Sequence, residues 1–150
     1  MKIIDLKTWV VATPPPHHGG TYWIFLKLTT DNGISGYGEV YGVPFAPQQV
    51  CALIEDVVDD HVIGETPFSI ETIWRTVYAR AFTLHPDLTI GGVLSGIEIA
   101  CWDIIGKALE QPVYNLLGGK VHERLRSYTY LYGDTHEGGE LSAIDVHSDP

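Results

Sequence analysis

The chain has 150 residues, of which 45% are hydrophobic and 11% aromatic, so it is long and apolar enough to bury one core. Nineteen acidic residues oppose nine basic ones, and a formal charge of −10 without a Lys/Arg cluster argues against nucleic acid and anionic membranes as partners. No signal peptide or membrane span is predicted, because the apolar N-terminal run is short and interrupted by charges.

The first forty residues predict a three-stranded antiparallel meander. β-branched and aromatic residues alternate with polar ones, which is typical of strands that are wet on one side. Asp31-Asn32-Gly33 is a tight-turn signal between the second and third strands. Gly36 and Gly38 weaken the third strand and indicate a bulge or a closely approaching backbone. The predicted strands cover residues 2–11, 22–30 and 34–40.

Two irregular segments interrupt or follow this meander. Residues 13–21, TPPPHHGGT, cannot form regular structure, because three prolines remove backbone donors and two glycines allow unusual conformations. Residues 41–47, YGVPFAP, form a second loop of the same kind. Both loops are therefore expected to project from the sheet.

Helices are predicted after the meander, because apolar residues then recur every three or four positions. The first covers residues 48–61, and the second opens at Thr66-Pro67 or Ser69 and runs to residue 82. Each of the two cysteines, Cys51 and Cys101, lies inside an apolar helical pattern, which indicates reduced core residues of a cytoplasmic protein. Strands followed by a helical bundle give an α+β fold.

A long apolar block, residues 90–119, closes the helical part. Asp103 and Lys107 form a narrow polar stripe on it, and Gln111-Pro112 ends its helix before one further turn. Glu98 lies among apolar neighbours, where a carboxylate needs a partner. With Ser95 it can form a capping box, so we favour a structural role for Glu98 over a catalytic one.

The tail differs in composition. Residues 126–132, RSYTYLY, predict another strand, whereas residues 133–150 are rich in glycine and acidic side chains and cannot build a core. A polar run within the tail either binds a cation or stays solvated, and the second alternative is favoured. The seven histidines have no metal-ligand spacing, so no metal site is predicted. The polar run consists of Asp134, His136, Glu137 and Glu140.

The long block carries a family resemblance. Its order and spacing resemble the first signature of the mandelate racemase and muconate lactonizing enzyme family, a branch of the enolase superfamily, with Val93 and Cys101 in place of the usual alanines. Both replacements are small and apolar, so they affect packing more than identity. The motif belongs to a shared scaffold and does not name the reaction. The matching residues are Ile97-Glu98, Ala100, Trp102-Asp103-Ile104, Gly106-Lys107, Pro112-Val113 and Leu116-Leu117-Gly118.

The resemblance implies a division of the chain. Residues 1–120 are expected to form an enolase-like N-terminal capping domain, and residues 121–150 a linker and the first strand of a C-terminal (β/α)8 TIM barrel. Such a barrel needs about 200 more residues than the chain contains. Family members hold an enediolate on Mg²⁺ with acidic ligands and Lys or His bases on barrel strands. These positions are expected beyond residue 150, so no catalytic residue and no metal ligand is assigned within the chain.

The same resemblance implies that the two loops fold over the barrel mouth and contact the distal end of a carboxylate substrate. Histidines and tyrosines donate and accept hydrogen bonds, which suits a hydroxylated acid. The predicted substrate-binding residues are therefore His17, His18, Tyr22 and Tyr41. For the histidines simple solvent exposure is an open alternative, and for Tyr41 packing is favoured.

The function that the resemblance implies, with dehydration favoured by the polar first loop, is the capping and specificity domain of a Mg²⁺-dependent sugar-acid (aldonate or aldarate) dehydratase. The cytoplasmic enzyme is expected to be a homo-oligomer, and the isolated 150-residue chain to be inactive. A racemase, epimerase or cycloisomerase on the same scaffold is the alternative among enzymes. A non-catalytic binding protein is the alternative if the gene ends at residue 150.

Overall fold

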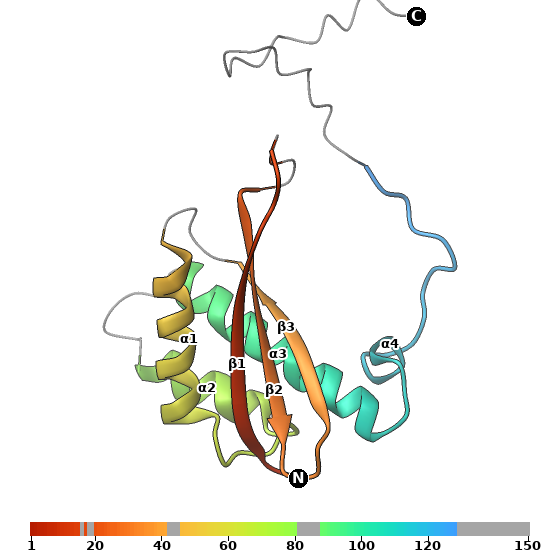
Figure 1. Ribbon diagram of the computed structural model, residues 1–150. Helices are drawn as coiled ribbons and strands as arrows, with labels where there is room; N and C mark the ends of the chain where they lie inside the picture. Colours follow the sequence, from red (N-terminus) through yellow and green to blue (C-terminus); the bar gives the residue numbers. More distant parts are fainter. Residues whose placement is uncertain (16, 18–19, 42–45, 81–87, 129–150) are drawn as a thin grey trace, which may run out of the picture.

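The computed structural model describes residues 1–15, 17, 20–41, 46–80 and 88–128. Three strands come first and the helices follow, which confirms the predicted α+β order (Figure 1). The elements are β1 (Ile3–Ala12), β2 (Tyr22–Thr30), β3 (Ser35–Val40), α1 (Pro47–His61), α2 (Ile70–Arg80), α3 (Leu88–Ala108) and α4 (Val113–Leu116).

The strands form one antiparallel sheet in the order β1-β2-β3. The β2–β3 turn is closed by the N–H of Gly33, which donates to the Thr30 carbonyl at 2.9 Å, and Gly33 adopts φ 84°, a conformation that suits glycine. The buried Thr30 hydroxyl donates to the Ile34 carbonyl at 2.8 Å across the same turn. The DNG signal therefore sits where the sequence predicts it.

The helices cover only one face of the sheet. Ile24, Leu26 and Leu28 of β2 alternate along the strand and are buried against the helices. In Figure 1 the sheet lies in front of the helices, so its other face is not covered by any described helix. The core is therefore a two-layer sandwich of sheet and helices.

The glycines of β3 mark a close approach of α3. A Cβ at Gly36 would lie 2.1 Å from the Ala100 carbonyl oxygen, and a Cβ at Gly38 would lie 1.9 Å from that of Gly96. Of the two alternatives left by the sequence, the close backbone is correct for these glycines. The register shift of the β1–β2 ladder lies between Ile3 and Asp5 instead.

Helix α3 is apolar on most of its surface because it packs against β2 and β3 on one side and contacts α1 and α2 on another. By length and hydropathy alone it also meets the criterion for a membrane span. Its buried residues include Leu94, Ile97 and Ile104, as expected for the central helix of a folded core.

The polar stripe of α3 has a specific partner. The Tyr37 N–H on the free edge of β3 donates to Asp103 Oδ2 at 3.0 Å. Lys107 Nζ donates to the same oxygen at 2.7 Å and to the Ser35 carbonyl at 2.8 Å. The pair therefore covers part of a strand edge that would otherwise be open to another strand.

Several predicted boundaries are confirmed or corrected. Helix α2 begins at Ile70, after Ser69, whereas its predicted end at residue 82 lies outside the described residues. The turn after Pro112 is α4, closed by the Gly119 N–H on the Tyr114 carbonyl at 2.8 Å. Both cysteines are free, as predicted.

The predicted strand at residues 126–132 is not seen in its described part. Residues 121–128 are exposed and belong to no helix or strand. Residues 129–150, including the polar run at 134–140, lie outside the described residues. The division at residue 120 therefore remains a prediction.

Candidate functional site

Both irregular segments leave the same end of the sheet. Ala12 pairs with Tyr22 where the first loop begins and ends, and Val40 pairs with Ile24 just before the second loop. Figure 1 shows the described ends of β1, β2 and β3 that border these segments at the end of the sheet opposite the N-terminus. The described ends of the two predicted loops therefore lie at one end of the sheet, whereas residues 16, 18–19 and 42–45 are not described.

The first loop is closed by hydrogen bonds of its own. The Thr13 N–H donates to the Thr21 carbonyl at 3.0 Å, and the Thr13 hydroxyl donates to the Gly20 carbonyl. Inside this closure, the His17 N–H donates to the Pro14 carbonyl at 2.9 Å and the Gly20 N–H to the His17 carbonyl at 3.0 Å. Because the prolines prevent this segment from forming a strand, its backbone N–H and carbonyl groups form hydrogen bonds within turns instead.

The imidazole ring of His17 also forms a hydrogen bond within the loop. Its Nδ1 lies 2.8 Å from the Thr13 carbonyl oxygen, and because a carbonyl only accepts, Nδ1 must carry the proton. In the neutral ring Nε2 is then the free acceptor. The side chain is exposed, and its backbone adopts φ 61°, which costs a non-glycine residue about 1 kcal/mol. An accepting nitrogen with a fixed ring orientation suits a hydroxyl ligand.

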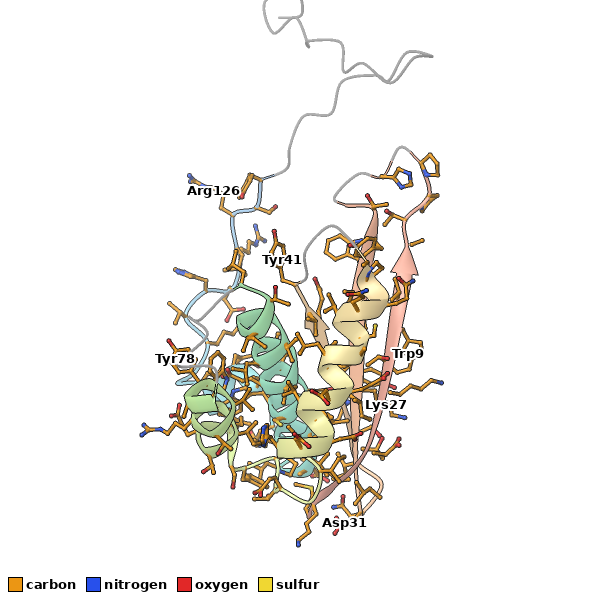
Figure 2. The ribbon with its side chains drawn as sticks, turned by 90° about the vertical axis from the view of Figure 1, so that its left-hand side faces the viewer. Trp9, Lys27, Asp31, Tyr41, Tyr78 and Arg126 are labelled. Atoms are coloured by element: carbon orange, nitrogen blue, oxygen red, sulfur yellow. The ribbon has the colours of Figure 1, made fainter. Side chains whose placement is uncertain are left out.

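The other predicted contact residues differ in position. Tyr41 follows β3 and is 74% exposed, so it is available at the loop end of the sheet (Figure 2). Tyr22 is half-buried and packs against the core cluster, so packing accounts for much of its surface. His18 lies outside the described residues.

Gly92 on α3 supports the second loop, and the sequence analysis did not single it out. A Cβ at this position would lie 2.1 Å from the Tyr41 carbonyl oxygen. Gly92, Gly96 and Ala100 follow one another at four-residue steps and meet Tyr41 and the β3 glycines in turn. The sequence did contain a signal for this contact, because small residues spaced four apart lie on one face of a helix.

Glu98 has a structural environment, as the sequence analysis favoured, but with different partners. Trp74 Nε1 donates to Oε2 at 2.7 Å, and Trp102 Nε1 donates to Oε1 at 3.2 Å. The capping-box prediction is wrong, because α3 already starts at Leu88 and Ser95 is an exposed residue in its interior. The two indoles therefore satisfy the carboxylate and tie α2 to α3.

Among the described residues, one side chain has a pKa far from its ordinary value. Burial raises the pKa of the Cys101 thiol to about 12, and the Glu98 carboxylate adds to the rise. Cys101 is therefore a neutral core thiol rather than a nucleophile. Within the described ranges, no three His, Cys, Asp or Glu side chains come together as a metal site.

The family of this chain follows from its similarity to known proteins. The model of the mandelate racemase/muconate lactonizing enzyme N-terminal domain matches residues 11–118. The chain belongs to the mandelate racemase/muconate lactonizing enzyme family. The sheet and helices described above are accordingly the fold of the N-terminal capping domain of the enolase superfamily.

Three relatives illustrate the similarity. D-galactonate dehydratase of Klebsiella pneumoniae (strain 342) is 37% identical over 134 residues, covering 89% of this chain and 32% of the relative. The crystal structure of a candidate family member from Labrenzia alexandrii DFL-11 has 57% identity and a TM-score of 0.84, covering 88% of this chain and 34% of that one. A mandelate racemase/muconate lactonizing enzyme-like protein from Roseovarius sp. TM1035 has 52% identity and a TM-score of 0.84, with 93% and 35% covered. The chain thus spans about a third of the length of these relatives.

Proposed function

We propose that this chain is the capping and substrate-specificity domain of a sugar-acid dehydratase that acts on aldonic or aldaric acids. The family membership supports a role in an enolase-superfamily enzyme. The similarity to D-galactonate dehydratase, at 37% identity over most of the chain, supports dehydration of a sugar acid in particular.

The geometry of His17 carries the proposal for substrate recognition. Its Nδ1–H is bound to the Thr13 carbonyl, so its exposed Nε2 accepts a hydrogen bond from a hydroxyl group of the substrate. Tyr41 is proposed to add a contact from the same end of the sheet, and Tyr22 to support it from its half-buried position. His18, which lies outside the described residues, is proposed to act with them. A polyhydroxylated acid offers the donors that such a surface requires.

The chemistry of the reaction defines what the cap must do. A proton α to an ionised carboxylate is very weakly acidic, so the enediolate formed by its removal must be stabilised as its charge develops. Family resemblance assigns that task to Mg²⁺, but the described residues do not fit a metal site. The proposed tasks of this chain are therefore to orient the distal hydroxyls and to exclude water when the loops close.

The proposal is tested on the enzyme that carries this chain at its N-terminus. We expect at least one member of a panel of aldonic and aldaric acids to be converted to a 2-keto-3-deoxy acid. Exchange of the α-hydrogen with D₂O without release of a keto acid would instead identify a racemase or epimerase. No reaction with any acid in the panel would refute the dehydratase proposal.

The role of the loop is tested by substitution. His17→Ala is expected to lower kcat/KM for the preferred acid about tenfold, which corresponds to one hydrogen bond of about 1.4 kcal/mol. His18→Ala is expected to act in the same direction. The matched control is His122→Ala, because His122 is exposed outside every helix and strand and far along the chain from the loop. Unchanged kinetics for both loop variants would remove these histidines from the site.

A further inference from the structure

Thr13 lies at the end of the β1–β2 ladder, and its N–H, hydroxyl and carbonyl groups all form hydrogen bonds within the first loop. The N–H donates to the Thr21 carbonyl at 3.0 Å, one step beyond the last pair of the two strands. The hydroxyl donates to the Gly20 carbonyl, and the carbonyl accepts from Nδ1 of His17 at 2.8 Å. Thr13 therefore joins the imidazole ring of His17 directly to the end of the sheet.

This connection determines what the ring offers to a ligand. Nδ1 of His17 carries the proton that the Thr13 carbonyl accepts, so the other nitrogen of the neutral ring, Nε2, is an acceptor. The side chain is exposed, and no described residue forms a hydrogen bond with Nε2. The backbone that carries the ring is held by the turn bonds of the same loop. The first loop thus presents one oriented acceptor to a ligand.

A hydroxyl group and a carboxylate differ in how they meet such an acceptor. A hydroxyl donates its proton to Nε2 of the neutral ring. A carboxylate only accepts, so it faces the lone pair of Nε2 unless the ring first takes up a second proton. A site that accepts a hydrogen bond from a hydroxyl therefore discriminates against a ligand with a carboxylate in its place, because both groups are then left unpaired.

Positive charge that would compensate a carboxylate is also scarce at this end of the sheet. Neither loop sequence, 13–21 or 41–47, contains a lysine or an arginine. The strand ends at residues 8–12, 22–26 and 36–40 contain one charged side chain, the exposed Glu39. The nearest lysines of the sheet, Lys7 and Lys27, pair with each other five residues further along the strands, about 17 Å from the loop end. The described end of the sheet therefore lacks the cations with which proteins bind carboxylates.

We propose that this cap selects aldonic acids, which end in a hydroxyl group, over aldaric acids, which end in a second carboxylate, and that Nε2 of His17 makes the distinction. Thr13 acts as the positioning residue, because its carbonyl sets which nitrogen of the ring accepts. The selection rests on the proposed function, in which the distal end of a sugar acid meets the first loop. It narrows the substrate class to polyhydroxylated monocarboxylic acids.

The first test compares two acids of the same configuration that differ only at the distal carbon, which is a hydroxymethyl group in one and a carboxylate in the other. With the enzyme that carries this chain at its N-terminus, at pH 8, kcat/KM is expected to be at least about tenfold higher for the aldonic acid. Equal values, or faster dehydration of the aldaric acid, would overturn the selection. If no sugar acid is dehydrated at all, the proposed function fails and the selection fails with it.

Substitution of His17 inverts its hydrogen-bonding role. In His17→Lys an ammonium group that only donates replaces the accepting nitrogen, so kcat/KM for the aldaric acid relative to the aldonic acid is expected to rise at least about tenfold. The matched control is His122→Lys, which adds the same charge at an exposed residue outside every described helix and strand and should leave this ratio unchanged. Circular dichroism checks that each variant is folded. A ratio in His17→Lys no higher than in the control would overturn the role of Nε2.

The role of Thr13 is measured on the ring itself. In the 150-residue chain at pH 8, the ¹⁵N resonances of the neutral His17 imidazole are expected to show a protonated Nδ1 and an unprotonated Nε2. Thr13→Val removes the hydroxyl that holds Gly20, so the population should shift towards the tautomer protonated at Nε2, and the preference for the aldonic acid should fall at least about threefold. Thr13→Ser keeps the hydroxyl and is expected to preserve both.

The two possible contradictions have different consequences. A folded Thr13→Val chain with an unchanged tautomer and an unchanged preference would show that Thr13 does not position the ring. A protonated Nε2 in the unmodified chain would overturn the selection itself, because the first loop would then donate to its ligand instead of accepting from it.

Discussion

Because β3 and α3 are in close contact, a single methyl group added between them is expected to lower the stability of the fold strongly. In Gly38→Ala the new Cβ would lie 1.9 Å from the Gly96 carbonyl oxygen, which is backbone and cannot rotate away. A carbon–oxygen contact settles at about 3.3 Å, so strand and helix must separate by roughly 1.4 Å. The separation weakens packing along the whole contact between β3 and α3.

The magnitude follows from two opposing terms. Overpacking of this severity costs about 3 kcal/mol, the upper end of the usual range. Alanine regains roughly 0.5–1 kcal/mol, because it loses less backbone entropy than glycine when the strand forms. The net loss in unfolding free energy is about 2 kcal/mol, which lowers Tm by about 4–8 °C in a chain of this size.

The assay is thermal and urea denaturation followed by circular dichroism. Gly91→Ala is the matched control, because Gly91 lies on the same helix as Gly96 and has nothing within 4 Å of an added Cβ. Its helix propensity should raise stability by up to about 1 kcal/mol. The reasoning is refuted if Gly38→Ala stays within about 0.5 kcal/mol of the unmodified chain, or if Gly91→Ala is destabilised equally.

Three further predictions concern the carboxylate and the thiols of the helical layer. Glu98→Ala leaves the indole N–H groups of Trp74 and Trp102 without their acceptor and should cost about 2 kcal/mol, measured by urea denaturation with tryptophan fluorescence; an unchanged midpoint would contradict this. Because the raised pKa of Cys101 keeps its thiol protonated, iodoacetamide at pH 8 should modify Cys51 first and Cys101 only after unfolding, as read by mass spectrometry. The folded state binds the Cys101 proton more tightly, so its contribution to stability is full at neutral pH and should be lost as pH rises towards about 12. Cys101→Ala should lack this alkaline loss, and an identical pH profile would argue against the shift.

The element order, the DNG turn and the family signature were readable in the sequence because each depends on neighbours along the chain. Alternating side chains, a left-handed glycine and an apolar helical period are local requirements. The two loops were also predictable, since prolines and glycines exclude regular structure wherever they stand.

Contacts between distant segments had to come from the tertiary structure. Glu98 was recognised as a carboxylate in need of a partner, but Trp74 lies on another helix, and the sequence offered only the nearby Ser95. Likewise, Gly38 indicated in the sequence that another backbone lies close to β3, but the sequence did not show that this backbone is that of Gly96. The neighbours of a residue along the chain indicate whether it needs a hydrogen-bond partner or a closely packed backbone. Only the packing of helices on each other and on the sheet determines which residue, tens of positions away, meets that need.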